Sequence, residues 1–376
     1  MSQPVELPRW IDLVVLPAFN VCVALLVAGL VVWSIGLDPL QVLALLIKGA
    51  FGSRAGLSYT LYYATTFVFT GLAVAVAFHG GLFNIGGEGQ AMMGGLGAAL
   101  VGLWLGQQGP AIVVLPLMVL AAMLAGMVWA AIPGALQAWR GSHIVITTIM
   151  FNFLAAALLV YLLVEVLKEP GNMAPESRAF GPHAQVPGMH VVLAALGIQW
   201  PKTPLNASVL LAVVSVVGVW LFLWRTRAGY ALRATGFAPE AARYAGIVPR
   251  RQILMAMGIA GALAGLVGIN EIAGVHNRLL QDFTAGAGFA GIAVSLIGRN
   301  HPVGIVGASL LFGALYQGGA ELAFEVPGFS REMVATLQGL IVLFAGAMAM
   351  VAAPLFARLY AMWRRSDRAA AGATHG

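Results

Sequence analysis

The sequence predicts an all-α membrane protein with about ten transmembrane helices. Only 9% of its 376 residues are charged and 60% are apolar, whereas soluble domains carry about 25% charged residues. Mean hydropathy is +0.89. The apolar runs mostly approach the ~20 residues that a membrane helix needs and are apolar on all sides, unlike the short alternating segments of a β-barrel. This composition excludes a soluble globular domain.

Ten apolar runs are candidate spans. The first has no small-residue cleavage site, so it is predicted to be a retained span and not a signal peptide. The eighth is shorter than a full span and lies in a glycine-rich region. In chain order the predicted spans are 13–35, 57–78, 88–106, 110–132, 143–166, 206–224, 253–273, 286–298, 302–324 and 333–356.

The distribution of basic residues predicts the orientation. With both termini inside the cell, 13 of the 20 Lys and Arg residues fall on the cytoplasmic side and 7 outside, which agrees with the positive-inside rule. The net charge of +6 therefore reflects residues that flank spans, not a nucleic-acid surface. The predicted organisation is a cytoplasmic N-terminus (1–12), a transmembrane domain (13–356) with a periplasmic loop (167–205) and a cytoplasmic loop (225–252), and a basic cytoplasmic tail (357–376).

The cytoplasmic loop contains a predicted short helix. It carries six Arg and one Glu. Pro239 suits the first turn of a helix and Gly246 suits the residue after its end, so residues 239–246 are predicted to form a helix outside the membrane. The alternative is an ordinary basic connection.

Two glycine-rich stretches predict broken helices. Residues 77–97 hold eight glycines and residues 284–309 hold six. A carboxylate such as Glu88 is costly at membrane depth, so an interrupted helix that lines a cavity explains the first stretch better than packing alone. Two such stretches in opposite halves also suggest an internal duplication. The predicted substrate-pathway residues are Asn84, Glu88, Gln90, Gly86, Gly87 and Gly89.

Two other features keep simpler interpretations. The run Gly261–Gly265 is predicted to serve close helix packing. Glu321, in the ninth span, fits a solvated rim and a pathway role equally well.

The sequence contains no P-loop motif for ATP binding and no motif for a metal site. The sequence lacks the Gly-Lys-Ser/Thr of a P-loop, so ATP is not expected to bind by that route. The seven His residues form no i, i+4 pair, and Cys22 is a lone cysteine in an apolar run, so no metal site is predicted. The chain is not predicted to be an enzyme by itself.

Four motifs resemble permease subunits of ABC importers, in the branch that carries nucleosides and simple sugars. The resemblance covers residues from about 10 to 355 and rests mainly on the first and third of its stretches. They are GLFNIGGEGQ (81–90), GSHIVITTIMFNF (141–153), ATGFAPEAARYAGI (234–247) and GFAGIAVSLIGRNHPVGIV (288–306).

The resemblance implies a multisubunit importer in a bacterial cytoplasmic membrane. Two permease chains, identical or different, would form the pore. Two cytoplasmic ATPases would bind ATP and Mg, leaving no cofactor in this chain. A periplasmic or lipid-anchored binding protein of the basic-membrane-protein type would deliver solute, and the permease would work by alternating access. The stretch 234–247 resembles the family's coupling segment, which assigns ATPase coupling to Pro239, Glu240, Ala241, Ala242, Arg243 and Gly246.

One departure and three alternatives remain. Many family members have Asn-Glu where this chain has His143-Ile144, which makes a different solute conceivable. The same architecture could import ribose, another simple sugar or a branched-chain amino acid. A gradient-driven secondary transporter could use Glu88 and Glu321 as ion-binding groups, but it gives the loop 225–252 no evident use. A structural membrane scaffold would not need two broken helices.

Overall fold

The described chain is helical. The computed structural model describes residues 15–169, 171 and 173–326, together with residues 8, 11 and scattered positions between 333 and 360. Three isolated β-bridges are the only extended pairings among these residues. The predicted span 333–356 and the tail 357–376 fall largely outside the described residues. The helices are α1 (Leu16–Ser34), α2 (Pro39–Phe51), α3 (Arg54–His79), α4 (Gly87–Leu105), α5 (Ala111–Arg140), α6 (Ile144–Glu165), η2 (Pro182–Ala184), α7 (Met189–Ala194), α8 (Ser208–Arg225), α9 (Arg227–Phe237), α10 (Pro239–Tyr244), α11 (Pro249–Gly265), η3 (Ile269–His276), α12 (Ala287–Ile297) and α13 (Pro302–Glu325).

Six helical segments of the described chain are long and apolar enough to cross a membrane. They are α3, α5, α6, α8, α13 and the continuous segment Pro249–His276, and the bent pair α1–α2 would add at most one more. α4 and the short α12 coincide with two further predicted spans. A multi-helix membrane protein is thus supported, whereas the number ten stays a prediction.

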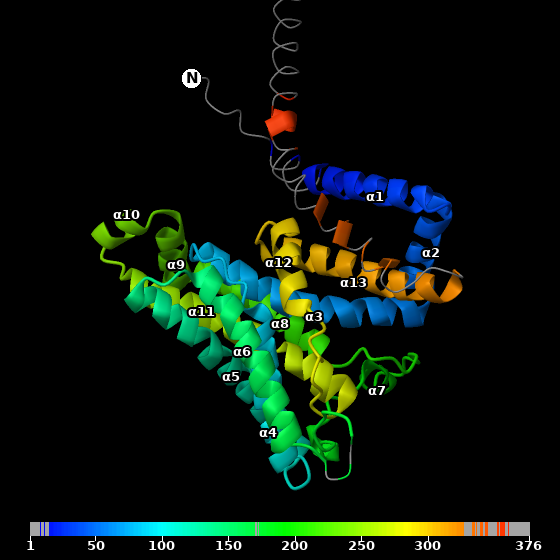
Figure 1. The fold of residues 1–376 in the computed structure, drawn as a ribbon, viewed down its shortest axis with the longest axis horizontal. Helices are drawn as coiled ribbons and strands as arrows, with labels where there is room; N and C mark the ends of the chain where they lie inside the picture. The colour runs from blue at the N-terminus through cyan, green and yellow to red at the C-terminus, as the bar shows by residue number, and fades with distance from the viewer. Residues whose placement is uncertain are drawn as a thin grey trace, which may run out of the picture. The chain divides into compact units, whose positions relative to one another are not determined.

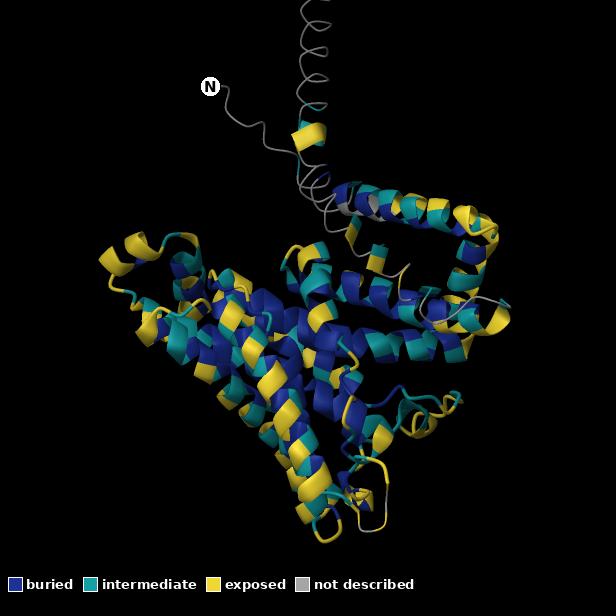
Figure 2. Ribbon diagram, in the orientation of Figure 1, coloured by how far each residue is buried: buried dark blue, intermediate teal, exposed yellow. Residues whose placement is uncertain are grey.

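The chain divides into two compact units, one of residues 1–46 with 319–376 and one of residues 47–318. In the larger unit, α11 packs against α5, α4 and α3, and α12 packs against α3 (Figure 1). α3 lies in the centre, with 83% of its span buried, against 22% for α5 and α8 (Figure 2). The outward faces of α5 and α8 are apolar, as helices in contact with lipid require.

Glycine permits the closest of these helix contacts. A Cβ atom added to Gly94 would collide with the backbone of Gly265, and one added to Gly261 would collide with the Gly126 carbonyl. Small residues let helix backbones approach one another where side chains would hold them apart. The packing role predicted for Gly261–Gly265 is therefore confirmed.

Besides the short η2 and α7 in the loop 167–205, two longer helices form where the sequence interpretation has only connections. α2 begins directly after α1: Gly36 adopts a left-handed φ of +85°, and the Asp38 carboxylate accepts the Leu40 N–H at 2.9 Å. α9 begins directly after Thr226, whose hydroxyl accepts the Gly229 N–H at 3.0 Å. Both starts carry ordinary capping residues, but neither helix is long or apolar enough to register as a span.

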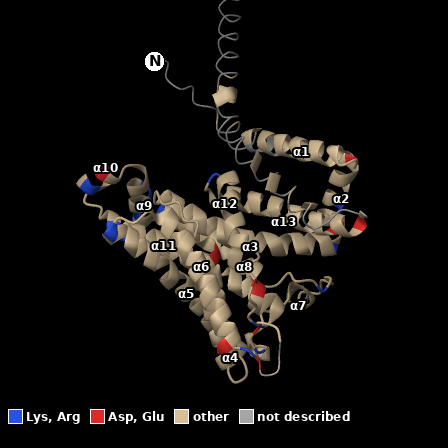
Figure 3. Cartoon of the chain, in the orientation of Figure 1, with Lys and Arg blue, Asp and Glu red and all other residues tan. Residues whose placement is uncertain are grey.

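Charge is confined mainly to the ends and connections of the larger unit. Lys and Arg residues gather around α9 and α10, while the helix bodies are almost free of charge (Figure 3). The predicted helix over 239–246 is confirmed as α10, with Pro239 in its first turn. Gly246 has a φ of +79° and donates to the Arg243 carbonyl, which closes the helix as predicted.

Candidate functional site

The first glycine-rich stretch forms a junction between two helices. α3 ends at His79 and α4 begins at Gly87. Within the junction, the Asn84 and Gln90 side chains exchange two hydrogen bonds of 3.1 Å, and Asn84 Oδ1 also accepts the Gly86 N–H. Both side chains are only 1% exposed. These amides therefore hold the turn into α4 in one conformation.

Helix α6 also forms hydrogen bonds with the junction between α3 and α4. Asn152 accepts the Gly89 N–H at 2.9 Å and donates to the Ile85 carbonyl at 3.0 Å. A Cβ atom on Gly89 would press against Asn152. Asn152 lies in the motif 141–153, but the sequence interpretation assigns it no role. The one feature of the sequence that could have indicated a role for Asn152 is the presence of an amide inside a strongly apolar helix.

Glu88 joins the two glycine-rich stretches. Its carboxylate accepts the Thr284 hydroxyl at 2.5 Å, the Gly286 N–H at 3.0 Å and the Gly288 N–H at 2.7 Å. The side chain is 5% exposed and lies in the first turn of α4, where the helix dipole favours negative charge. Hydrogen bonds to backbone and hydroxyl donors thus stabilise a carboxylate in an apolar setting.

The second glycine-rich stretch also joins two helices. α12 ends at Ile297 and α13 begins at Pro302. Gly288, near the start of α12, lies directly against the α4 N-terminus, and a Cβ atom there would collide with the backbone of Glu88. The two stretches, about 200 residues apart in the sequence, meet here. Whether they are interrupted spans or the halves of a duplication stays a prediction.

A second buried carboxylate, Glu271, belongs to none of the predicted sites. It lies in η3, the π-helical segment that follows α11. Tyr62 and Thr66, one turn apart on α3, donate their hydroxyls to its two oxygens. π-helical turns often occur at functional sites. An acid at the end of the predicted span 253–273 was the signal in the sequence for this residue.

Asn270 extends the hydrogen bonding around Glu271. Its amide donates to Thr66 Oγ1 at 2.7 Å, and its Oδ1 accepts from Asn206 and Ser208 at 3.0 and 2.7 Å. All these side chains are buried. The network fixes η3 against α3 and the start of α8, so the Glu271 carboxylate has a defined position.

A cavity of about 290 Å³ opens beside Glu271. Four aromatic rings of α3 and α13 contribute to its wall: Tyr62, Tyr63, Phe67 and Tyr316. The segment that binds Glu88 supplies the opposite part of the wall through Phe283, Thr284 and Ala287. Glu88 itself is not among the lining residues and lies behind Thr284. The cavity thus combines an aromatic surface with carboxylate and hydroxyl groups.

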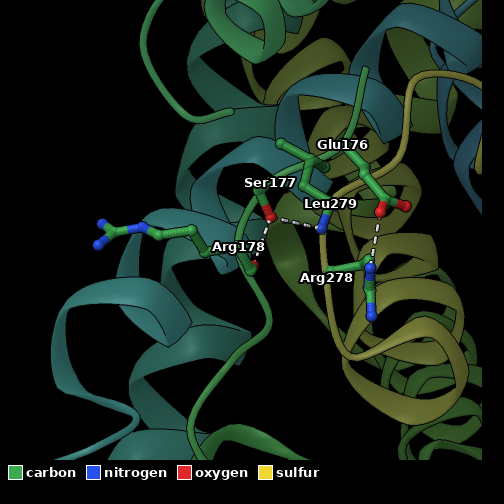
Figure 4. Close-up of polar contacts among 5 residues, drawn as sticks. All are labelled: Glu176, Ser177, Arg178, Arg278 and Leu279. Atoms are coloured by element: carbon green, nitrogen blue, oxygen red, sulfur yellow. Dashed lines mark hydrogen bonds and ion pairs between the residues drawn. The ribbon is translucent and has the colours of Figure 1, made fainter. Parts of the chain in front are cut away.

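The predicted outer loop 167–205 is bound to the residues that lead from η3 to the cavity wall (Figure 4). Ser177 and Leu279 are paired by two hydrogen bonds, of 2.9 and 3.0 Å, and Arg278 forms an ion pair with Glu176 at 2.7 Å. Further along the loop, the Phe180 N–H donates to the Asn277 carbonyl at 2.7 Å. The loop 167–205 is therefore packed onto residues 273–280, which connect η3 to the cavity wall.

Helix α10 lies in the predicted cytoplasmic loop 225–252 and projects from the larger unit. Phe237 and Tyr244 are 94% and 95% exposed, whereas Ala242 is buried. Arg243 and Glu240 form an exposed ion pair at 3.1 Å. The segment α9–α10 therefore presents two exposed aromatic rings, Phe237 at the end of α9 and Tyr244 in α10, together with the Arg243–Glu240 pair, a combination suited to contact with another protein. Five of the predicted coupling residues lie in α10 and Gly246 follows its end, and their role in ATPase coupling stays a prediction.

Comparison with known sequences decides the family. A family described as "Branched-chain amino acid transport system / permease component" matches residues 56–357. A glucose ABC transporter permease protein of Haloferax volcanii is 35% identical over 96% of this chain and 93% of its own length. A guanosine ABC transporter permease protein of Bacillus subtilis is 33% identical over 88% of this chain and 92% of its own. A nucleoside ABC transporter permease protein of Lactococcus lactis is 29% identical over 88% and 90%.

The chain belongs to this family of transport permeases. The permease is a multi-pass membrane protein and a transport component rather than an enzyme, as the sequence predicts. The matched region contains the Glu88 junction, the Glu271 cavity and α10. The predicted resemblance to nucleoside and sugar permeases is confirmed at the level of the family.

Proposed function

We propose that this permease carries nucleosides, purine nucleosides among them, across the cytoplasmic membrane as a subunit of an ATP-driven importer. The observation that carries the proposal is the similarity to permeases named for guanosine and for nucleosides, each of which matches 88% of the chain. The cavity beside Glu271 adds support, because aromatic rings and hydrogen-bond acceptors suit a solute with a planar base and hydroxyl groups.

A simple sugar is the second candidate solute. The Haloferax relative is named for glucose and is 35% identical, so the same architecture importing ribose or another sugar has specific support. A gradient-driven secondary transporter is the more distant alternative, since its relatives would not be named as ABC transporter permeases.

The proposed complex has four kinds of component. Two permease chains, identical or different, form the pore within membrane lipid, and a periplasmic or lipid-anchored protein delivers solute to them. Two cytoplasmic ATPases bind ATP and Mg, so this chain needs no cofactor. In each permease chain, α10, with its exposed ends and its Gly246 turn, is proposed to dock into one of the ATPases. ATP-driven closure of the ATPases would then switch the pore between outward-open and inward-open states.

The proposed topology places both termini in the cytoplasm of a bacterial cell. Residues 1–12 and 357–376 are cytoplasmic, 167–205 is periplasmic and 225–252 is the cytoplasmic coupling loop. About ten helices enter the membrane between residues 13 and 356, two of them interrupted at the glycine-rich stretches. α4 and α12 support this arrangement, because each is apolar, starts at a glycine-rich junction and packs against the central helices.

The junction before α4 is proposed to shape the pathway. Asn84, Glu88 and Gln90, together with Gly86, Gly87 and Gly89, are buried, and Glu88 holds the wall segment 284–288 in position. In this role Glu88 binds the wall segment directly, while Asn84 and Gln90 hold the turn into α4, and all of them act on the pathway from behind its surface.

Uptake measurements test the proposal. The importer is expressed with its ATPase and binding protein in cells that lack nucleoside import, and tritiated guanosine uptake is measured with unlabelled inosine, ribose and glucose as competitors. We expect inosine to compete and the two sugars not to. Competition by a sugar alone would favour the sugar candidate. Uptake that survives ATP depletion but collapses with a protonophore would favour the secondary transporter.

A further inference from the structure

We infer that the 290 Å³ cavity beside Glu271 is the site where the permease itself holds a nucleoside during transport. The aromatic wall would stack on the base, and the Glu271 carboxylate would accept hydrogen bonds from the sugar hydroxyls. This inference rests on the proposed function and makes it specific, because it assigns solute contact to residues outside the predicted Asn84–Gln90 set.

The aromatic wall is continuous across two helices. Phe67 and Tyr316 have ring centroids 5.0 Å apart, Tyr63 and Tyr316 are 5.7 Å apart, and Tyr62 and Tyr63 are 5.1 Å apart. The contributing helices α3 and α13 are far apart in the sequence. Stacking on aromatic rings tolerates any base, because every base has a π-face. The wall therefore suits nucleosides as a class.

The polar part of the cavity includes hydrogen-bond acceptors at Glu271 and Tyr62. A carboxylate offers about four acceptor positions, and Glu271 uses three of them for Tyr62, Thr66 and Asn270. The Tyr62 hydroxyl donates its hydrogen to Glu271 and so presents only acceptor capacity to the cavity. A solute that donates hydrogen bonds through hydroxyl groups satisfies these atoms.

The charges of the lining residues disfavour phosphorylated solutes. Among the described residues that line the cavity are two acids, Glu271 and Asp282, and no Lys or Arg. Like charges repel strongly in a low-dielectric setting, so a nucleotide would be disfavoured relative to a nucleoside. The volume lies at the lower end of the ~300–1,000 Å³ typical of ligand pockets, which fits a small neutral solute.

Glu88 differs from Glu271 in its partners. The Glu88 carboxylate accepts hydrogen bonds from two backbone N–H groups and from the Thr284 hydroxyl, and Glu88 does not line the cavity. Glu88 is thus a positioning residue for the wall segment 284–288. Glu271 is the buried carboxylate that faces the solute.

The test uses the complete importer in proteoliposomes, with tritiated guanosine as the probe. Tyr63→Leu removes one ring of the wall, and Glu271→Gln removes the charged acceptor while keeping the shape. We expect each to lower guanosine uptake at subsaturating solute by about tenfold or more, with the ATPase still bound. Tyr63→Phe keeps the ring and is expected to stay within about twofold of the unmodified importer.

Two control variants match these changes. Tyr59 lies one turn before Tyr63 on α3 and is not among the lining residues, so Tyr59→Leu controls for loss of a tyrosine from this helix. Glu165 is exposed at the end of α6, so Glu165→Gln controls for loss of an acid. Both are expected to transport guanosine within about twofold of the unmodified importer.

A second readout separates solute contact from a structural role. With the unmodified importer, inosine is expected to inhibit guanosine uptake and guanosine monophosphate is not. Tyr63→Leu is expected to raise the guanosine concentration that gives half-maximal uptake, because stacking on the base is lost. A merely structural defect would lower the maximal uptake rate without changing that concentration.

The outcomes distinguish the two proposals. If the unmodified importer takes up guanosine but Tyr63→Leu and Glu271→Gln transport normally, the site is wrong and the nucleoside function stands. If the unmodified importer takes up glucose and not guanosine, both the nucleoside function and the nucleoside site are wrong. If Glu271→Gln fails to assemble, Tyr63→Leu compared with Tyr63→Phe decides the assignment, because Tyr63 is only partly buried.

Discussion

At the scale of single residues, Glu88 in the first turn of α4 is important for structure as well as for the predicted pathway. Replacing it with Ala would leave the Gly286 and Gly288 N–H groups without an acceptor, at a cost of about 1–3 kcal/mol for each buried group. We therefore expect Glu88→Ala to lower the melting temperature of the permease and to impair assembly or uptake. Thermal unfolding of the purified complex and guanosine uptake measure both effects.

The conservative change at the same position is the control. Glu88→Gln keeps an oxygen that can accept a backbone N–H, so we expect a smaller loss of stability than with Ala. Normal melting and normal uptake of Glu88→Ala would remove Glu88 from any role in the pathway.

Gly288 gives a second prediction. Its missing side chain lets the start of α12 lie directly against the backbone of Gly87 and Glu88, so Gly288→Ala forces the two elements apart. Overpacking of this kind costs about 1–3 kcal/mol. The matched control is Gly307→Ala in α13, where an added Cβ atom meets nothing within 4 Å. Equal melting temperatures for the two variants would contradict the close contact.

At the scale of elements, composition and hydropathy locate the long apolar helices. The predicted runs 88–106 and 143–166 are the helices Gly87–Leu105 and Ile144–Glu165, because a long apolar run has few alternatives in lipid. Hydropathy does not predict α2 and α9. Their evidence lies in capping residues such as Asp38 and Thr226, and a local cap is a weaker signal than twenty apolar residues.

The coupling helix is the element with the sharpest prediction. Gly246 ends α10 with a φ of +79°, a conformation that costs a residue with a Cβ atom about 1–2 kcal/mol. We expect Gly246→Trp to leave the chain inserted in the membrane but to release the ATPase, as measured by co-purification and by solute-stimulated ATP hydrolysis. Gly246→Asn tolerates this conformation and should keep the ATPase bound. Undiminished association and transport in Gly246→Trp would argue against docking at α10.

At the scale of the whole molecule, the site is harder to predict than the spans. The sequence marks residues 80–90 and 284–309 as unusual, but it does not show that Glu88 binds the backbone of Gly286 and Gly288. It gives still less warning of Glu271, whose partners Tyr62 and Thr66 lie about 200 residues earlier. These contacts follow from packing between distant helices, and no periodicity within either helix records them.

Membrane orientation is the last prediction, and it concerns the chain as a whole. Met173 is 94% exposed in the loop 167–205, and Tyr244 is 95% exposed at the end of α10. α8 is the one span candidate between them, and its 18 residues extend about 27 Å, close to the hydrocarbon thickness. The two positions are therefore expected on opposite sides of the membrane.

Cysteine labelling measures this directly. Cys22 is the chain's one cysteine, so Cys22→Ser gives a background for Met173→Cys and Tyr244→Cys. In intact spheroplasts, an impermeant maleimide should label Met173→Cys, while Tyr244→Cys should react only after the membrane is opened. The basic loop 225–252, with six Arg, favours this orientation over its inverse. Labelling of both positions from outside would mean that α8 does not cross the membrane, and the reverse pattern would place the coupling helix where no cytoplasmic ATPase could reach it.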